Sequence, residues 1–547
     1  MRHTTVERGL DMRMVLVLLC AVAFVAAVAG CYSDEAGAKY IANFDKKPGG
    51  GKDAHYWVKK IGDPAETQDA FKYLSELKDK SVVPDLVKLF NGEKEKAHRG
   101  DIAMVLADLG DTSVVPALIN GVTFEVSDKI GEQQVSDRAN EKIALALAKL
   151  GDPAAKPVLV KLLDAKAANV ISAAVKAQLT FKDPDAVAKL GEIVRKDQLA
   201  RNIRGDALKV LGEIGDPRAV PAIVRAMYVE KGGTIYPEAS YALAQIGPAA
   251  VPDLIKTLER QNKEVEDIGK NFIVGAIEAK AADTLGWICD KSAYEPMSKM
   301  LQKFVKEGDN PIATAKTAFA IARLQDTRAV AIIAKFVEDE EDPSVRQHYT
   351  LALNMLGDRG ATKVLLKASK KPDVDKYKKE GASEMELNIL RESRNDVVRA
   401  LARLGTGKDL PDYQKMAAGE KDEKVKTVMK DYQPMLEASK DCEAKLDCWM
   451  GKLNDPNKIV REKAAYELGR IGGDQACDAL IKLIDDKEQP VQFASMQGIY
   501  NLAEKNGAKL LSLYEAKVES MDKNKAEKMK EDLKMMKLRL MKASGKK

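Results

Sequence analysis

Aromatic residues are scarce in this sequence. They make up 5% of its 547 residues, whereas alanine, leucine, valine and lysine are frequent. Sheets are usually built from aromatic and β-branched residues, while close helix packing uses small side chains. The composition therefore favours an all-α fold. The 88 basic and 83 acidic residues leave a net charge of only +5, too small an excess to attract nucleic acid, which we exclude as a partner.

The sequence also lacks the short motifs that carry catalysis or metal binding. It contains no G-x-S-x-G elbow, no Walker loop and no zinc-type spacing of cysteine and histidine. Its clustered acids, such as Glu340-Glu341-Asp342, fit the solvated end of a helix. We therefore predict no catalytic residue, no cofactor and no metal site.

A short apolar run from Met14 to Ala29 follows Arg13. A charged flank before such a run is typical of an export signal, and the run is short for a membrane span of about 20 residues. It ends in Val28-Ala29-Gly30-Cys31, which resembles the signal of bacterial lipoproteins. The resemblance implies lipidation of the Cys31 sulfur and removal of residues 1–30. An ordinary secretory signal with a chance cysteine is the alternative.

The residues around this signal bear on the start and the destination of the chain. Glu7 and Asp11 are unusual in a leader and leave Met12 and Met14 as alternative starts. By the same resemblance, Tyr32 after the cysteine indicates the outer membrane, with the protein facing the periplasm. Residues 31–54 are polar and predict a flexible tether that spans about 25 Å on average.

One sequence motif recurs from about residue 55 onward. It reads Leu109-Gly110-Asp111-Thr112-Ser113-Val114-Val115-Pro116, and copies begin at Leu150, Ile214, Ile246, Leu356 and Ile471. Degenerate copies lie between them, among them Leu285-Gly286 and Leu404-Gly405. Neighbouring copies are commonly 31 to 33 residues apart and sometimes 40 or more. About 11–12 repeats fit the chain.

Each position of this motif has a structural role. Glycine ends one helix in the left-handed conformation, aspartate caps the next helix, and proline lies in its first turn. Each repeat is therefore a helical hairpin, and hairpins must stack to bury their apolar faces. The prediction is an α-α superhelix with a concave inner surface, formed by residues 55–433 and by C-terminal repeats at 434–510.

The repeats resemble HEAT-repeat proteins of the phycobilisome-lyase type, over roughly residues 60–505. The openings Asp342-Pro343-Ser344-Val345-Arg346, Asp396-Val397-Val398-Arg399 and Asp455-Pro456-Asn457-Lys458-Ile459-Val460-Arg461 carry the likeness. The resemblance implies that the Asp and Arg residues of these openings form ladders between repeats. Direct contact of Arg346, Arg399 and Arg461 with a ligand is the alternative.

Some proteins with repeats of this kind are enzymes. Deoxyhypusine hydroxylase builds its di-iron centre from His-Glu pairs. Here Thr, Tyr, Arg and Tyr follow the four histidines, which are His3, His55, His98 and His348. A bilin lyase acts on pigment in the cytoplasm, where an exported lipoprotein would not meet it. We therefore expect no lyase or hydroxylase activity and predict that the protein is not an enzyme.

Cysteine usage fits an oxidising compartment. Without Cys20 and Cys31, four cysteines remain: Cys289, Cys442, Cys448 and Cys477. We predict a disulfide between Cys442 and Cys448. On one continuous helix their Cα atoms would lie about 9 Å apart, so the chain must bend near residues 445–447, with Asp447 capping the next helix. Two unrelated buried thiols are the alternative.

The C-terminal segment, residues 511–547, is predicted to be a basic amphipathic helix. Residues 517–547 hold eleven basic and five acidic side chains. An apolar stripe runs through the segment: Tyr514, Val518, Met521, Met529, Leu533, Met536 and Leu540. It can cover the last repeat, lie on an anionic membrane or bind a partner.

The sequence thus favours a membrane-tethered, non-catalytic scaffold or adaptor of the bacterial cell envelope, which binds a protein or peptide on its concave face. A lipoprotein that binds a small molecule or glycan is the alternative. The scarcity of aromatic platforms argues against it, since the only tryptophans are Trp57, Trp287 and Trp449.

Overall fold

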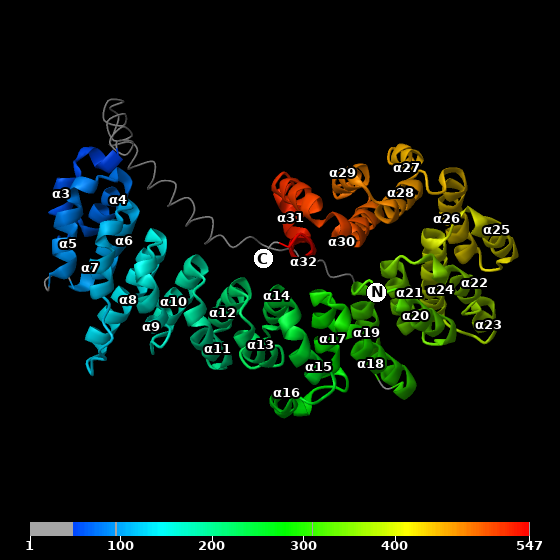
Figure 1. The fold of residues 1–547 in the computed structure, drawn as a ribbon, viewed down its shortest axis with the longest axis horizontal. Coiled ribbons are helices and arrows are strands. Elements are labelled where there is room, and N and C mark those ends of the chain that lie inside the picture. The colour runs from blue at the N-terminus through cyan, green and yellow to red at the C-terminus, as the bar shows by residue number, and fades with distance from the viewer. Residues whose placement is uncertain (1–47, 93–95, 309, 546–547) are drawn as a thin grey trace, which may run out of the picture. The chain divides into compact units, whose positions relative to one another are not determined.

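The computed structural model describes residues 48–92, 96–308 and 310–545 of the chain. Within these ranges the regular elements are helices and no strand is present. The chain forms two compact units, one ending at Phe181 and the other beginning at Lys182 (Figure 1). The predicted all-α fold is confirmed. Cys31 and most of the predicted tether lie outside the described residues, as do residues 1–30.

The first unit is a stack of helical hairpins. Short turns join α4 to α5, α6 to α7 and α8 to α9, and α10 follows. The first helices of successive hairpins contact one another in order, from α4 to α6, α8 and α10. The helices of this unit are α3 (Ala54–Val58), α4 (Thr67–Leu77), α5 (Val83–Asn91), α6 (Arg99–Leu109), α7 (Val115–Asn120), α8 (Ile130–Leu150), α9 (Lys156–Leu162) and α10 (Ala168–Phe181).

Residues 48–54 differ from the prediction of a free tether. A 3-10 turn, η1 (Pro48–Gly51), packs against α4, and the indole Nε1 of Trp57 donates a hydrogen bond to the carbonyl of Gly49 at 2.8 Å. Gly49 has a φ of 68°, and a Cβ there would lie 2.7 Å from the Leu77 side chain. The glycines therefore allow a close approach to the first hairpin rather than supplying flexibility.

The second unit continues the pattern over more hairpins. One helix of each hairpin, called an inner helix below, contacts the corresponding helix of the next hairpin. The order is α12, α14, α17, α19, α21, α24, α26, α28, α30 and α32. The unit contains α11 (Val187–Arg195), α12 (Arg201–Ile214), α13 (Val220–Ala226), α14 (Tyr236–Ile246), α15 (Val251–Leu258), α16 (Lys263–Ile268), α17 (Ala276–Ile288), α18 (Tyr294–Glu307), α19 (Pro311–Arg323), α20 (Arg328–Asp339), α21 (Pro343–Leu356), α22 (Thr362–Ala368), α23 (Val374–Lys379), α24 (Glu384–Leu404), α25 (Leu410–Gly419), α26 (Glu423–Cys442), α27 (Leu446–Lys452), α28 (Lys458–Ile471), α29 (Asp474–Leu483), α30 (Gln489–Glu519), α31 (Lys523–Lys528) and α32 (Lys530–Ala543).

The turns between paired helices have the structure that the repeated motif predicts. Gly110 ends α6 with a φ of 66°, and the Asp111 carboxylate accepts a hydrogen bond from the Ser113 amide. The degenerate copy at Leu285-Gly286 is displaced, because Gly286 lies inside α17, where a Cβ would be 2.7 Å from Ala320. The left-handed turn residue there is Cys289, with a φ of 59°. The motif therefore predicts a turn at Gly286, whereas this glycine lies where α17 contacts α19.

The C-terminal helices fold back onto the inner layer of their own unit. On α30, the Tyr500 hydroxyl donates to the Arg323 carbonyl at 2.8 Å, and the Gln497 amide donates to the Met355 carbonyl at 2.9 Å. Arg359 and Glu467, on α28, form an ion pair at 2.8 Å. Lys534, on α32, lies 3.7 Å from the ring centroid of Tyr241. In the second unit, therefore, part of the predicted concave surface is covered by the protein itself.

The segment boundaries within this unit differ from those predicted. The boundary at residue 433 lies inside α26, which contains Pro434, and the boundary at 510 lies inside α30. α32 packs on α30, where the Tyr514 hydroxyl donates to the Leu533 carbonyl at 3.1 Å, and Leu540 is fully buried. The apolar stripe thus covers the last repeat, one of the three alternatives considered for it.

The search for membrane-spanning segments is negative over the described part of the chain. None of its helices is both long enough and apolar enough to cross a membrane.

Candidate binding pocket

A cavity of about 800 Å³ lies in the second unit, between the inner helices and the helices that fold back on them. Residues of α17, α19, α21, α24 and α28 form one part of its wall. Residues of α30, α31 and α32 form the other part. The volume falls in the range of small-molecule and cofactor sites. The fold-back of the C-terminal helices therefore creates the pocket, since residues 489–536 supply 13 of the 21 lining residues.

Ten of the 21 residues that line the pocket are methionines or aromatic residues, and most of the others are polar or charged. Thioethers are flexible and polarisable, so they adapt to ligands of differing shape, while aromatic rings provide large apolar surfaces. Phe493 is 57% exposed, so its apolar ring is open to solvent. The methionines are Met355, Met496, Met529, Met535 and Met536, and the aromatic residues are Trp287, Phe319, Tyr466, Phe493 and Tyr500.

The charged residues of the pocket are of two kinds. Arg323, stacked 3.8 Å from the ring centroid of Trp287, is paired with Asp283, and Arg403 is paired with Glu462 at 2.7 Å. By contrast, Lys525 and Lys528 form no ion pair within the described ranges. Lys528 is exposed and Lys525 is half-buried, and both line the pocket. Asp532 of α32 also lines the pocket, so the lining carries charges of both signs.

Asn354 is the most unusual polar residue of the lining. Its side chain comes from the C-terminal half of α21 and is 7% exposed. Neither the Nδ2 nor the Oδ1 atom has a hydrogen-bond partner. A buried polar group without a partner costs about 1–3 kcal/mol. Both atoms are also shielded from solvent, so this carboxamide is unsatisfied behind the lining of the pocket.

A polar cluster on α28 joins this helix to the end of α24. The Lys463 ammonium is fully buried and donates to the carbonyls of Arg403 and Gly405 at 2.6 and 2.8 Å. It also pairs with Glu467 at 3.1 Å. Burial lowers the pKa of Lys463 to about 8 and raises the pKa of Glu462. These contacts fix α28 against the end of α24.

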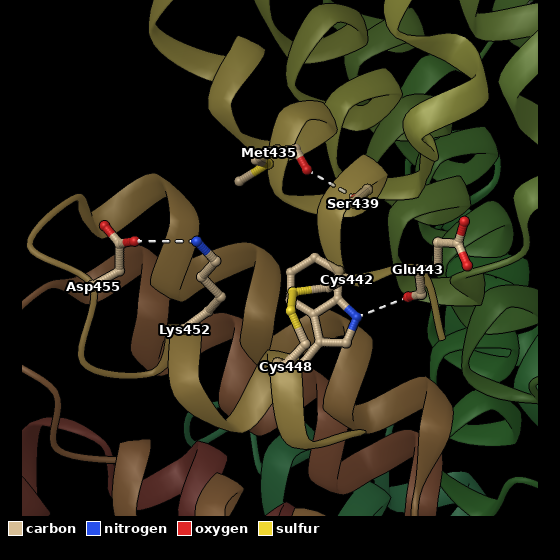
Figure 2. Close-up of a disulfide and its surroundings, with 8 residues drawn as sticks. Met435, Ser439, Cys442, Glu443, Cys448, Lys452 and Asp455 are labelled. Atoms are coloured by element: carbon tan, nitrogen blue, oxygen red, sulfur yellow. Dashed lines mark hydrogen bonds and ion pairs between the residues drawn. A yellow bond between two sulfur atoms is a disulfide. The ribbon is translucent and has the colours of Figure 1, made fainter. Parts of the chain in front are cut away.

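A disulfide joins Cys442 and Cys448, with Cα atoms 5.3 Å apart (Figure 2). α26 ends at Cys442, Glu443 adopts a φ of 50°, and α27 begins at Leu446. The Trp449 indole, fully buried beside the bridge, donates to the Glu443 carbonyl at 2.9 Å. The bend lies near the predicted place, but Asp447 does not cap α27, because the N-cap is Lys445. Cys289 and Cys477 are free thiols.

The arginines of the predicted ladders have different roles. Arg346 is buried and donates to the carbonyls of Val337, Ala368 and Lys371, at the ends of neighbouring helices. Asp342 instead caps its own helix. The ladder is therefore made by arginine and main-chain carbonyls, not by Asp-Arg pairs, at this position.

Arg461 fits the ladder more closely, since it pairs with Asp486 at 3.2 Å. Arg399 does not, because Asp396 and Arg399 lie inside α24 and bond to each other. Arg394 links the repeats there, donating to the Ser369 carbonyl at 2.6 Å. None of the three predicted arginines lines the pocket described above.

The sequence reasoning missed the pocket itself. Asn354 lies in an ordinary helical stretch, and the residues of the opposite wall lie more than 130 positions later in the chain. The available signal was the methionine content of the C-terminal stripe. A search for groups of three or more His, Cys, Asp or Glu side chains able to hold a metal finds none among the described residues.

Comparisons with known families identify the repeats. Residues 298–386 match the model of HEAT repeats. Residues 141–165, 203–228 and 460–486 match the PBS lyase HEAT-like repeat. The chain therefore contains repeats of both kinds, as the resemblance predicted. No curated protein matches the chain.

Several solved structures are similar to this chain. An engineered protein is 17% identical with a TM-score of 0.28, over 77% of this chain and 98% of its own. Kap121p bound to RanGTP is 12% identical with a TM-score of 0.34, over 90% of this chain and 58% of its own. The S. pombe condensin Cnd3-Cnd2 subcomplex is 11% identical with a TM-score of 0.31, over 89% and 75%. These values are too low to transfer a partner or an activity.

Proposed function

We propose that this protein is a membrane-tethered scaffold or adaptor of the bacterial cell envelope, which binds a protein or peptide and catalyses no reaction. The chain is a HEAT-repeat solenoid, a fold typical of protein-binding scaffolds. The observation that carries the proposal is the pocket of about 800 Å³ lined by methionine and aromatic side chains. Such a surface accepts apolar side chains of varied shape.

The tether belongs to the proposal and rests on the sequence. The lipoprotein-type signal at residues 1–30 and the lipid-accepting Cys31 support an anchor in the outer membrane, with the folded units in the periplasm. Metabolic labelling with a palmitate analogue tests this directly. We expect label on the wild-type chain and none on Cys31→Ser, which should move to the soluble fraction. Label retained on Cys31→Ser would contradict the anchor.

Affinity capture from solubilised envelope tests the binding role. The wild-type chain is compared with Phe493→Glu, which places a charge in the pocket from an exposed position and should not disturb the fold. Ile273→Glu is the matched control, because Ile273 is 69% exposed and lies outside the pocket. We expect partners that mass spectrometry finds with the wild type and the control but not with Phe493→Glu. Identical partners for all three would overturn the pocket as the binding surface.

A lipoprotein that binds a small molecule or glycan is the second candidate. The size of the pocket, and the Trp287 ring within its lining, favour this alternative. Thermal-shift screening against envelope metabolites separates the two, because a ligand that binds only the folded state raises the melting temperature. Stabilisation by a metabolite that is lost in Phe493→Glu would support the second candidate over the first.

A further inference from the structure

The C-terminal helices have an apolar core of their own. We call α27–α32 the C-terminal arm. Among the described residues, the buried members of its apolar cluster lie between Ala438 and Leu540, in the end of α26 and in the arm. One apolar side chain from earlier in the chain, Cys289, packs against them. The arm therefore folds mainly on itself, and little of its apolar core is shared with the inner helices α14, α17, α19 and α21.

Polar contacts hold the arm against these inner helices, and they form a row. From α14 to the turn after α21, they include Lys534 with the Tyr241 ring, Tyr500 with the Cys289 thiol and the Arg323 carbonyl, Gln497 with the Met355 carbonyl, and Glu467 with Arg359. Arg323 is the last residue of α19, and Met355 lies in the last turn of α21. Water can bond to a carbonyl at a helix end once a side chain leaves it. The row can therefore open without leaving these carbonyls unpaired.

The base of the arm is held differently from the row. The Lys463 ammonium is fully buried and donates to the carbonyls of Arg403 and Gly405. The disulfide described above joins the arm to α26. At the row, by contrast, the Arg359 side chain is 34% exposed and Lys534 is half-buried. The arm thus has a buried, cross-linked base and a row of contacts that water can reach, as a hinged element requires.

We propose that the C-terminal arm is a clamp, which swings as one body about its base and so opens and closes the pocket on a segment of a bound protein. The bound segment rests on the proposed function, whereas the movement of the arm does not. The cavity of about 800 Å³ lies between the arm and the inner helices, although protein interiors are normally close-packed. Because its two walls have separate apolar cores, the width of the pocket changes when the arm moves. A segment that touches both walls favours the closed state.

Thiol labelling measures the movement, because the two free cysteines differ in where they lie. Cys289 lies where the arm meets the end of α17, and Cys477 is fully buried in the core of the arm. In the full chain with Cys31→Ser, iodoacetamide labelling followed by mass spectrometry of peptides gives a rate for each thiol. Opening of the arm exposes Cys289 alone, whereas unfolding of the arm exposes both thiols.

The test variant, Arg359→Gln with Lys534→Met, removes the two contacts at the ends of the row. These side chains contact Glu467 and Tyr241, so the substitutions do not act on the Cys289 thiol directly. Glu467 keeps ion pairs inside the arm at 2.8 and 3.1 Å, so no buried charge loses its partners. Contacts made only in the closed state hold the arm closed, so their removal raises the open population. We expect Cys289 to be labelled at least fivefold faster than in the wild type.

The matched control, Arg201→Gln with Lys509→Met, removes polar contacts that do not cross between the arm and the inner helices. Arg201 pairs with Glu238 across α12 and α14, and Lys509 pairs with Asp478 within the arm. The control should leave the labelling rate of Cys289 within twofold of the wild type. Labelling of the buried thiol in the arm core should stay within twofold in both variants.

Two results would overturn the inference. Equal labelling of Cys289 in the test and control variants would show that the arm is fixed on the inner helices. Parallel acceleration of Cys289 and Cys477 in the test variant would show that the arm unfolds rather than swings.

The capture experiment distinguishes this failure from failure of the proposed function. Partners that are lost in Phe493→Glu, together with equal labelling of Cys289 in the test and control variants, would leave the scaffold standing and remove the clamp. Faster labelling of Cys289 in the test variant alone, without any captured partner, would remove the envelope scaffold and leave the clamp.

Discussion

The two units are built from the same hairpin but are held together in different ways. In the first unit, contacts between helices follow the order of the chain, from α4 to α6, α8 and α10. In the second, side chains far apart in sequence meet. Arg359 and Glu467 are separated by 108 positions, Arg323 and Tyr500 by 177, and Cys289 and Tyr500 by 211.

The difference matters for stability and for function. A stack of nearest neighbours gains stability repeat by repeat. A stack whose last helices return to earlier ones gains contacts that depend on the whole unit, and here they enclose a pocket. We therefore expect the second unit to respond to distant changes that the first unit does not feel.

Removal of residues 523–547 should have the largest effect. It exposes the surface that Leu533, Met536, Leu538 and Leu540 cover, each at most 7% exposed. At about 1.5–3 kcal/mol for each buried apolar side chain, the second unit should lose more than about 5 kcal/mol. Hydrogen exchange should show faster exchange in α28 and α30 and unchanged exchange in α6 and α8.

The first unit is the internal control for this truncation. Equal loss of protection in both units would break the comparison, since the first unit makes its contacts in chain order. A truncated protein that keeps its melting temperature but loses binding to anionic vesicles would instead assign the C-terminal helix to the membrane. We expect negligible vesicle binding by the unlipidated full chain.

The ladder arginines give the next largest effect. Arg346→Leu leaves three carbonyls of neighbouring helices without their donor and should cost about 3 kcal/mol in chemical denaturation. Arg399→Leu should cost less than about 1 kcal/mol, because Arg399 bonds to Glu392 and Asp396 of its own helix. Equal costs would mean that the linking role does not depend on the carbonyl contacts.

This pair also shows what the sequence could predict. Residues 342–346 and 396–399 have similar patterns, with Asp four and three residues before Arg, yet the first opens a helix and the second lies within α24. The hairpin turns were predictable because glycine and aspartate act locally, as at Gly110 and Asp111. The position of residues 396–399 within a long helix was not predictable. α24 begins at Glu384, where Ser383 forms a capping box, and the repeated motif does not contain this signal.

The pocket could not be predicted from the sequence for a similar reason. Asn354 and Phe493 share a cavity through the fold-back of α30, a contact that no local pattern encodes. The apolar stripe of residues 514–540 predicted that the C-terminal helix packs against something. It did not predict that Met529 and Met536 would also line a cavity. Local rules thus specify the hairpins, whereas the site depends on long-range closure.

The disulfide tests whether the step from α26 to α28 supports the fold-back. Replacing both cysteines, Cys442→Ser with Cys448→Ser, removes a short cross-link and should cost about 2 kcal/mol, mainly in the second unit. Thiol counting on denatured, unreduced protein that begins after Cys31 should find two free thiols, Cys289 and Cys477. Four free thiols would contradict the bridge.

The smallest expected effect is a difference in pH dependence between the units. Burial lowers the pKa of Lys463 and of Lys542, both in the second unit, to about 8. In the unfolded chain a lysine keeps a pKa near 10.5, so the unfolded state binds more protons from pH 8 upward, and stability rises with pH. Between pH 8 and 9.5 each lysine should add about 1–2 kcal/mol to the free energy of unfolding.

This rise in stability should end near pH 10, because burial raises the pKa of tyrosines such as Tyr413 and Tyr514. Unfolded tyrosines then lose protons first, and stability falls. In the first unit, hydrogen bonds lower the pKa of Asp79 and Asp111, so the stability that these two carboxylates contribute should be lost as the pH falls below about 4. Denaturation at stepped pH, followed separately in each unit by hydrogen exchange, measures both trends. Lys463→Met should remove about half of the rise in the second unit, and a rise that persists in Lys463→Met with Lys542→Met would show that other groups cause it.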